Sequence, residues 1–238
     1  MRLAVVAAIE SYTPEDLERK SRYLRSVLHP DTQVDVFAAP SGVPYVESSF
    51  DLYLTEVAVA RKAVEVASRG YDAVVGTAFL DNGLDAVREL LDIPVVGPAR
   101  TTLYMAATLA NRFGVITAAG DLPKHVWACA KVLGVADRLV AVPALTCTVA
   151  DFLHDEENAV GLMLAAGKRL IEDQGAEAIV LGCGATTGLA SRLGRALGVP
   201  VLDPGLTAVK YAEMLVALGL SQSKRAYPHN PRTMQLLR

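Results

Sequence analysis

The sequence predicts an α/β protein of two similar lobes with mostly parallel sheets, related by a pseudo-twofold axis and with a site in the cleft between the lobes. Two observations predict this class. Short β-branched runs alternate with longer segments whose apolar residues recur at helical spacing, a pattern typical of strands joined by helical crossovers. In addition, the segment GYDAVVGTAFLDNGLDAVRELLDIPVVGPA at 70–99 resembles GAEAIVLGCGATTGLASRLGRALGVPVLDPG at 175–205.

The expected strands are the β-branched runs between the helical segments. They lie at residues 2–9, 33–39, 72–78, 93–97, 112–119, 138–142, 176–183 and 199–203. The first helix is expected to begin after Thr13, because Pro14 suits a first helical turn and Asp16 stands at the third position of a capping box. Strands that alternate with helices in this way favour right-handed crossovers and parallel pairing.

The repeat indicates where the two lobes divide. Gly70 matches Gly175, and Gly83 matches Gly188, at a constant offset of 105 positions. The run at 2–9 also resembles the run at 112–119, so a second lobe starts near the middle of the chain. Two copies indicate a duplication and not a solenoid. We therefore expect a first lobe from residues 1–98 plus 207–238 and a second lobe from residues 99–206.

Composition excludes several classes of partner. The chain has 238 residues with a net charge of −3, and no run of Lys or Arg gives a footprint for nucleic acid or for a membrane surface. The apolar N-terminal stretch is interrupted by Glu10 and a helix-start signal, so it is predicted to be a buried strand and not a signal peptide. We expect a soluble cytoplasmic protein with a small-molecule substrate.

The cysteine and histidine patterns favour neither a disulfide framework nor a metal site. Cys129, Cys147 and Cys183 are an odd number without paired spacing, and the chain has neither a CxxC nor an HxxxH motif. The cluster LHDEE at 153–157 is expected to begin a helix, whose dipole favours acids there. No motif for a metal, pyridoxal phosphate or a nucleotide is present, so no cofactor is expected.

Ala78 and Cys183 occupy matching positions at the carboxyl ends of two strands, where α/β sheets bind ligands. Gly184 follows the cysteine, and a helix is expected to start near Thr187. Unpaired backbone N–H groups at such a turn favour a thiolate, so we expect the Cys183 pKa to lie below that of a free cysteine. The alternative is a cysteine that only packs. Cys129 is expected in the core, and Cys147 in a loop or at a helix start.

Three segments resemble the hydantoin and allantoin racemases of the aspartate/glutamate racemase superfamily. They are AEAIVLGCGATTGLASRLGRALGVPVLDPGLTAVKYAEMLVALGLSQSKR, YDAVVGTAFLDNGLDAVRELLDIPVVGPARTTLYMAATLANRFGVIT and YVESSFD. The resemblance implies a cofactor-independent enzyme in which two cysteines flank an acidic Cα–H, one removing the proton and the other supplying one. Cys183 matches the second of these cysteines, and Gly184 and Ala185 match the turn that supplies backbone donors. Ala78 matches the first, so one thiol is missing.

The N-terminal segment also departs from the family. Ile9 to Thr13 replace the Asn-Pro-Asn-Thr-Ser of hydantoin racemases. Ile9, Thr77, Phe79 and Thr117 are expected to line the cleft beside Ala78, although strand-end packing is an equally good explanation for Phe79.

Ala78 leaves three functions open. The chain is a racemase inactivated by a cysteine-to-alanine exchange, a one-thiol enzyme that resembles arylmalonate decarboxylase, or a binding protein without turnover. Racemase chemistry is our first interpretation. The expected substrate is a neutral hydantoin-like ring or an amino-acid derivative, and the expected assembly is a homo-oligomer.

Overall fold

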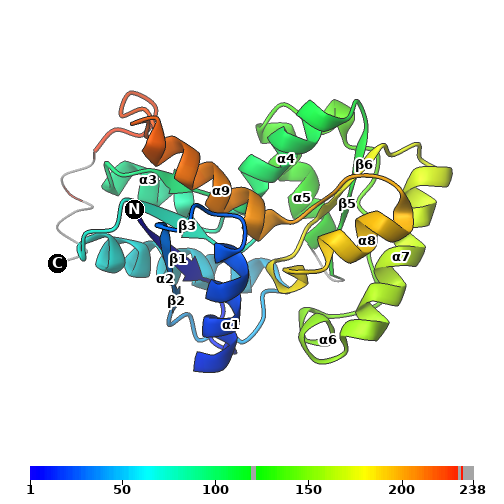
Figure 1. The fold of residues 1–238 in the computed structure, drawn as a ribbon, viewed down its shortest axis with the longest axis horizontal. Helices are drawn as coiled ribbons and strands as arrows, with labels where there is room; N and C mark the ends of the chain where they lie inside the picture. Colours follow the sequence, from blue (N-terminus) through cyan, green and yellow to red (C-terminus); the bar gives the residue numbers. More distant parts are fainter. Residues whose placement is uncertain (119–121, 230–231, 233–238) are drawn as a thin grey trace.

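Two parallel sheets, one in each half of the molecule, form the framework of the fold in a computed structural model that describes residues 1–118, 122–229 and 232 (Figure 1). The first sheet has the strand order β2 (Gln33–Ala38), β1 (Arg2–Ala7), β3 (Ala73–Gly76), β4 (Val95–Val96). The second sheet has the strand order β5 (Phe113–Ile116), β6 (Ala178–Leu181), β7 (Val201–Leu202). All strand pairs are parallel, which confirms the predicted α/β class.

Helices cover both faces of each sheet because the buried strands carry apolar side chains on both sides. On the first sheet, one face packs against α1 (Pro14–Arg25) and α9 (Pro204–Ala217), and the other against α2 (Ser49–Ala67) and α3 (Leu84–Leu90). On the second sheet, one face packs against α4 (Pro98–Leu109) and α5 (Leu122–Val132), and the other against α7 (Glu156–Glu172) and α8 (Ala190–Leu197). Short α6 (Val149–His154) precedes α7.

The second sheet repeats the layout of the first, as the sequence repeat predicts. β5 and β1 lie in corresponding places, as do β6 and β3, and β7 and β4. The expected strand at 138–142 is wrong as a regular strand, because this segment makes one isolated bridge, Phe113 to Leu139, and the next bridge, Thr117 to Ala144, lies beyond it. The segment still runs beside β5, in the place that β2 occupies beside β1 in the first sheet. Pro143 lacks the N–H that a longer ladder would need.

Two expected helix starts are confirmed. Thr13 forms a capping box with Asp16 before α1, and Pro14 is the first helical residue. In LHDEE, Asp155 accepts a hydrogen bond from the Asn158 backbone N–H and begins α7. These caps fix where the chain leaves each strand and enters the next helix, and thus where the loops at the carboxyl ends of the strands lie.

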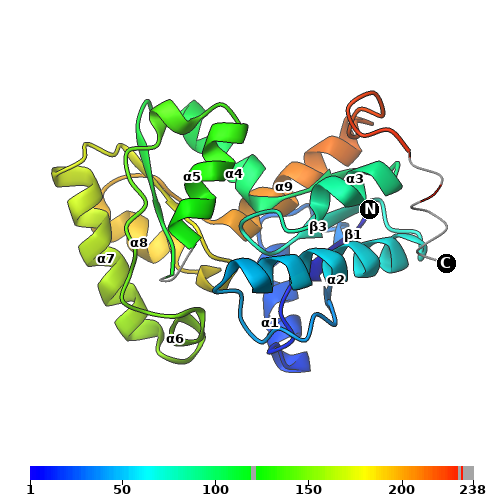
Figure 2. The same cartoon turned by 180° about the vertical axis from the view of Figure 1, so that it is seen from behind.

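The chain crosses between the two halves more than once. Helix α9 follows β7 but packs on the first sheet beside β3 and β4, and it also lies against α4 (Figure 2). The lobe bounds expected from the sequence remain a prediction, and residues 119–121, 230–231 and 233–238 of that division lie outside the described residues. Among the described residues, no helix is both long enough and apolar enough to cross a membrane.

Candidate functional site

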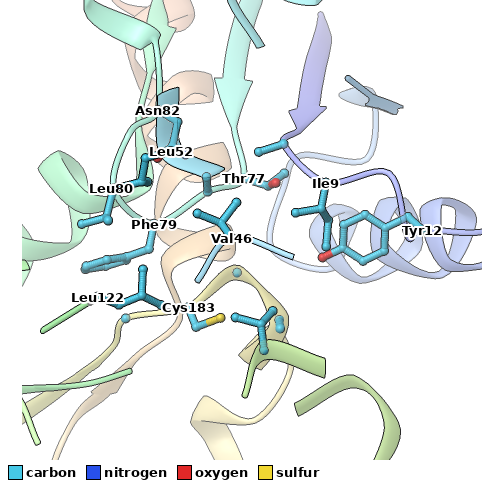
Figure 3. A pocket seen from close by; sticks show the side chains of 16 residues that line it. Ile9, Tyr12, Val46, Leu52, Thr77, Phe79, Leu80, Asn82, Leu122 and Cys183 are labelled. Carbon is cyan, nitrogen blue, oxygen red and sulfur yellow. The ribbon is translucent and has the colours of Figure 1, made fainter. Parts of the chain in front are cut away.

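A small cavity lies where the carboxyl ends of β1, β3 and β6 meet (Figure 3). It measures about 70 Å³ and takes residues from both halves of the molecule. Its lining consists of Ala8, Ile9, Tyr12, Val46, Leu52, Thr77, Ala78, Phe79, Leu80, Asn82, Leu122, Val149, Gly182, Cys183, Gly184 and Ala185. This is the edge at which parallel sheets present their loops to ligands.

Seven of the eight site residues predicted from the sequence line this cavity: Ile9, Thr77, Ala78, Phe79, Cys183, Gly184 and Ala185. Thr117 is the exception. Its side chain is fully buried, and its hydroxyl donates a hydrogen bond of 2.9 Å to the Gly182 carbonyl oxygen. Thr117 therefore stabilises the end of β6, because its hydroxyl is hydrogen-bonded to the backbone there and its side chain does not line the cavity.

Cys183 stands at the junction between β6 and a short 3-10 turn at Gly184–Thr186. The expected helix start near Thr187 is wrong, since α8 begins only at Ala190. Burial raises the pKa of the Cys183 thiol to about 11. This effect outweighs the hydrogen bond from the Ala185 backbone N–H and the positive charge of Lys20, both of which lower the pKa. The predicted depression of this pKa is therefore wrong, and the resting group is a protonated thiol.

Gly184 brings the thiol turn into close contact with the other sheet. A Cβ on Gly184 would lie 2.5 Å from the Thr77 carbonyl oxygen at the end of β3. Only a residue without a side chain fits between these two backbones. The contact sets the spacing between the two strand ends that carry Ala78 and Cys183.

We expect Gly184→Ala to lower the free energy of unfolding by about 1–3 kcal/mol, because the new methyl group overlaps a backbone atom that has little room to move. Thermal unfolding followed by circular dichroism measures the change. Gly161→Ala is the matched control, since Gly161 lies in α7 with nothing within 4 Å of an added Cβ. A Gly184→Ala protein that unfolds at the wild-type temperature would contradict the close contact.

The loop after β3, which carries Ala78, is fixed from both sides. Asp81 has a φ of 58° and accepts hydrogen bonds from the backbone N–H groups of Ala99 (2.8 Å) and Arg100 (3.1 Å) at the start of α4. Burial raises the pKa of the Asp81 carboxyl to about 6. Asn82 donates a 2.8 Å hydrogen bond to the Thr55 hydroxyl on α2. The position of Ala78 is thus determined by contacts to both halves.

Sequence reasoning missed the part of the site that α1 supplies. Tyr12 lines the cavity just before α1, and Lys20 is 7% exposed on that helix. The Lys20 Nζ lies 3.1 Å from the Gly184 carbonyl oxygen, 3.4 Å from the Tyr12 hydroxyl and 3.5 Å from the Thr187 hydroxyl. A signal was present, because Lys20 and Leu24 are the two buried residues of α1. A lysine on the buried face of an amphipathic helix is unusual.

The other cysteines lie outside the cavity lining. Cys129 packs against the core around β5 and β6, and burial raises its pKa to about 12. Cys147 directly precedes the cap of α6, as expected, and is buried in the same apolar cluster as Cys183. Across the described ranges, no group of three or more His, Cys, Asp or Glu side chains is placed to hold a metal ion.

The chain is similar to known racemases in sequence and in fold. The Asp/Glu/Hydantoin racemase family model matches residues 15–212. A hydantoin racemase from Paenarthrobacter aurescens is 35% identical over 215 residues, which is 90% of this chain and 91% of that protein. The allantoin racemase structure from Klebsiella pneumoniae has a TM-score of 0.91 at 31% identity and covers 100% of this chain and 99% of its own.

More distant structures share the fold alone. Arylmalonate decarboxylase superposes with a TM-score of 0.62 at 19% identity, over 95% of this chain and 97% of its own. Glutamate racemase from Francisella tularensis gives a TM-score of 0.65, also at 19% identity.

Proposed function

Because the chain belongs to the Asp/Glu/hydantoin racemase family, we propose that it is a cofactor-independent racemase that inverts a stereocentre next to a carbonyl group. One observation carries this proposal: the buried Cys183 thiol enters a cavity between two strand ends, in a chain that matches named racemases over most of its length. Its racemase homologues support an isomerase, and the position of the thiol in the cavity supports Cys183 as the group that moves the proton.

Cys183 is the acid and base on the side of the second sheet. As a thiolate, it removes the proton from Cα, and the electron pair moves onto the neighbouring carbonyl to give an enolate. As a thiol, it returns a proton to the carbon. Backbone N–H groups of the turn at Gly184 and Ala185 stand beside the sulfur and are the donors available to the enolate oxygen.

We propose a neutral, hydantoin-like ring as the substrate. Of the described residues that line the cavity, none carries a charged side chain, and most are apolar. A dicarboxylate would lose its hydration without an ion pair in return. Tyr12, Thr77 and Asn82 are the polar side chains that remain to bind ring N–H and C=O groups.

The test is chiral chromatography of single enantiomers from a panel of hydantoins, allantoin, amino acids and malonates. We expect racemisation of at least one hydantoin-type compound, unchanged after dialysis against EDTA. Turnover that is lost with EDTA and restored by zinc would contradict the thiol mechanism. Binding without turnover of any compound would instead favour a binding protein.

A second candidate function is decarboxylation, and Ala78 favours it. The methyl group of Ala78 extends the apolar wall beside Leu80 and Phe79, where a malonate carboxylate would lack solvation. The C–C bond between this carboxylate and the central carbon of the malonate would break to release carbon dioxide, and the electron pair of that bond would form an enolate. The Cys183 thiol, protonated at neutral pH, would then supply one proton to the carbon. The malonates in the panel separate this function from racemisation.

We further propose that the protein is a homo-oligomer in which α2 pairs with α2 of a second copy. Phe50, Tyr53, Leu54 and Val57 form a stripe on α2 and are 69%, 67%, 41% and 56% exposed. In an antiparallel pair, Phe50 of one copy would lie opposite Arg61 of the other, an arrangement that suits a cation–π contact. The cytoplasmic location expected from the sequence remains a prediction.

We expect Val57→Lys to reduce the mass measured by light scattering after gel filtration, because the charge would be buried at the centre of the paired helices. Val132→Lys is the control, since Val132 is 83% exposed on α5. An unchanged mass for Val57→Lys would exclude this face as the interface.

A further inference from the structure

Tyr12 and Cys183 reach the cavity from different directions (Figure 3). Tyr12 belongs to the segment between β1 and α1, and Cys183 to the end of β6, so the two residues come from different sheets. In Figure 3 the Tyr12 ring reaches inward with its hydroxyl oxygen at the inner end, and the Cys183 sulfur points toward that side. Among the lining side chains, Tyr12, Thr77, Asn82 and Cys183 carry exchangeable protons. Tyr12 differs from Thr77 and Asn82 because it contacts a cation.

Lys20 is that cation. Its Nζ donates a hydrogen bond to the Tyr12 hydroxyl oxygen at 3.4 Å and lies 5.2 Å from the centre of the Tyr12 ring. The same Nζ donates to the Gly184 carbonyl oxygen, one residue after Cys183, at 3.1 Å. No ion pair between described residues includes Lys20, so its positive charge has only neutral acceptors. A buried charge of this kind favours a negative charge that develops nearby.

We propose that Tyr12, supported by Lys20, is the second proton-transfer group of the site and takes the place of the missing thiol at position 78. This inference rests on the proposed racemase function. Tyr12 is the catalytic residue, because it faces the substrate cavity. Lys20 is a positioning residue that acts through Tyr12 and through the turn of Cys183.

In one direction, the Cys183 thiolate removes the Cα proton, an S–H bond forms, and the electron pair moves onto the carbonyl oxygen. The Tyr12 O–H then breaks and its proton forms a C–H bond on the opposite face of the enolate. The product is the other enantiomer, with a thiol at Cys183 and a phenolate at Tyr12. In the reverse direction the two groups exchange roles. One negative charge is present in the site throughout, first on the Cys183 sulfur, then on the enolate and finally on the Tyr12 oxygen, and the Lys20 ammonium balances it.

The groups around Cys183 set the pH dependence. Burial raises the thiol pKa, Cys147 before α6 and Glu47 before α2 raise it further, and Lys20 on α1 lowers it. Proton removal by Cys183 needs the thiolate form, so racemisation that starts at this residue should rise with pH toward about 11 in the wild type. Lys20→Met removes the charge that favours this form, so its rate should rise only at higher pH.

The test is Tyr12→Phe, assayed in D2O with each enantiomer separately. We expect racemisation to fall about 10²-fold or more, while one enantiomer, the one whose Cα–H faces Cys183, still exchanges its proton with retention of configuration. The other enantiomer should lose exchange. Tyr211→Phe, at an exposed tyrosine of α9, is the matched control.

Racemisation by Tyr12→Phe at the wild-type rate would overturn the proposal, as would an equal loss of exchange for both enantiomers in a folded protein. Lys20→Met should shift the pH profile and Lys20→Arg should restore it, whereas a purely structural lysine would change stability without this shift. A wild-type protein that racemises nothing would instead refute the proposed function, so the two failures are distinct.

Discussion

Replacing Cys183 by alanine is expected to lower turnover by about 10²–10⁴-fold, because the variant loses the only thiol that lines the cavity in the described part of the chain. The loss should appear in kcat, since the sulfur acts in the transition state and contributes little to holding the ring. Initial rates by chiral chromatography measure it. Cys129→Ala is the control, because Cys129 is a cysteine outside the cavity lining.

The same variant has a consequence for stability. The folded-state pKa of Cys183, about 11, lies above the ordinary value of 9.0, so the folded protein binds more protons than the unfolded chain between these values. The contribution of the Cys183 thiol to the free energy of unfolding is therefore fully present below about pH 9, and it is lost as the pH rises toward 11. In urea unfolding, the free energy of unfolding of Cys183→Ala should therefore fall less between about pH 9 and 11 than that of the wild type. A Cys183→Ala protein with wild-type turnover would refute the site.

Replacing Ala78 by cysteine is expected to raise racemisation by about 10²-fold, because a thiol at the end of β3 supplies a second acid–base group on the side opposite Cys183. Tyr12→Phe should then cost little in the Ala78→Cys background, since the new thiol takes over the transfer. If decarboxylation is the native reaction, the same change places a larger and more polar side chain in the apolar wall, and malonate turnover should fall.

Chiral chromatography of the single and double variants separates these outcomes. Ala78→Cys with Cys183→Ala should not racemise, because the two remaining proton-transfer groups, the new thiol and Tyr12, then both act on the face opposite Cys183. An Ala78→Cys protein with unchanged rate and stereochemistry would show that position 78 does not face the substrate.

The framework of the fold follows from local patterns. β-Branched runs and the repeat at 70–99 and 175–205 predict strands that the structure contains, because buried parallel strands carry continuous apolar sequence. The segment at 138–142 departs from this because Pro143 limits the ladder that its composition favours. Thr13 predicts its helix start because a capping box lies within four residues.

The site was harder to predict where it depends on contacts between distant segments. The strand-end position of Cys183 follows from its place after an apolar run. The pKa of Cys183 does not follow from the sequence, because burial outweighs the turn, and the burial depends on how both sheets close over the sulfur. The place of Lys20 on an amphipathic helix signals that it is buried, but Gly184 is 164 positions away, so the sequence does not identify its hydrogen-bond partner. Tyr12 lies in the cavity beside Lys20, which reaches from α1 to the distant Gly184 turn.

The measurement that tests the central claim most directly is deuterium incorporation at Cα, followed by proton NMR in D2O with single enantiomers of a 5-substituted hydantoin. The wild-type protein should incorporate deuterium while the optical activity decays, and Cys183→Ala should do neither above the uncatalysed rate. Deuterium incorporation by Cys183→Ala at the wild-type rate would contradict proton transfer by this thiol.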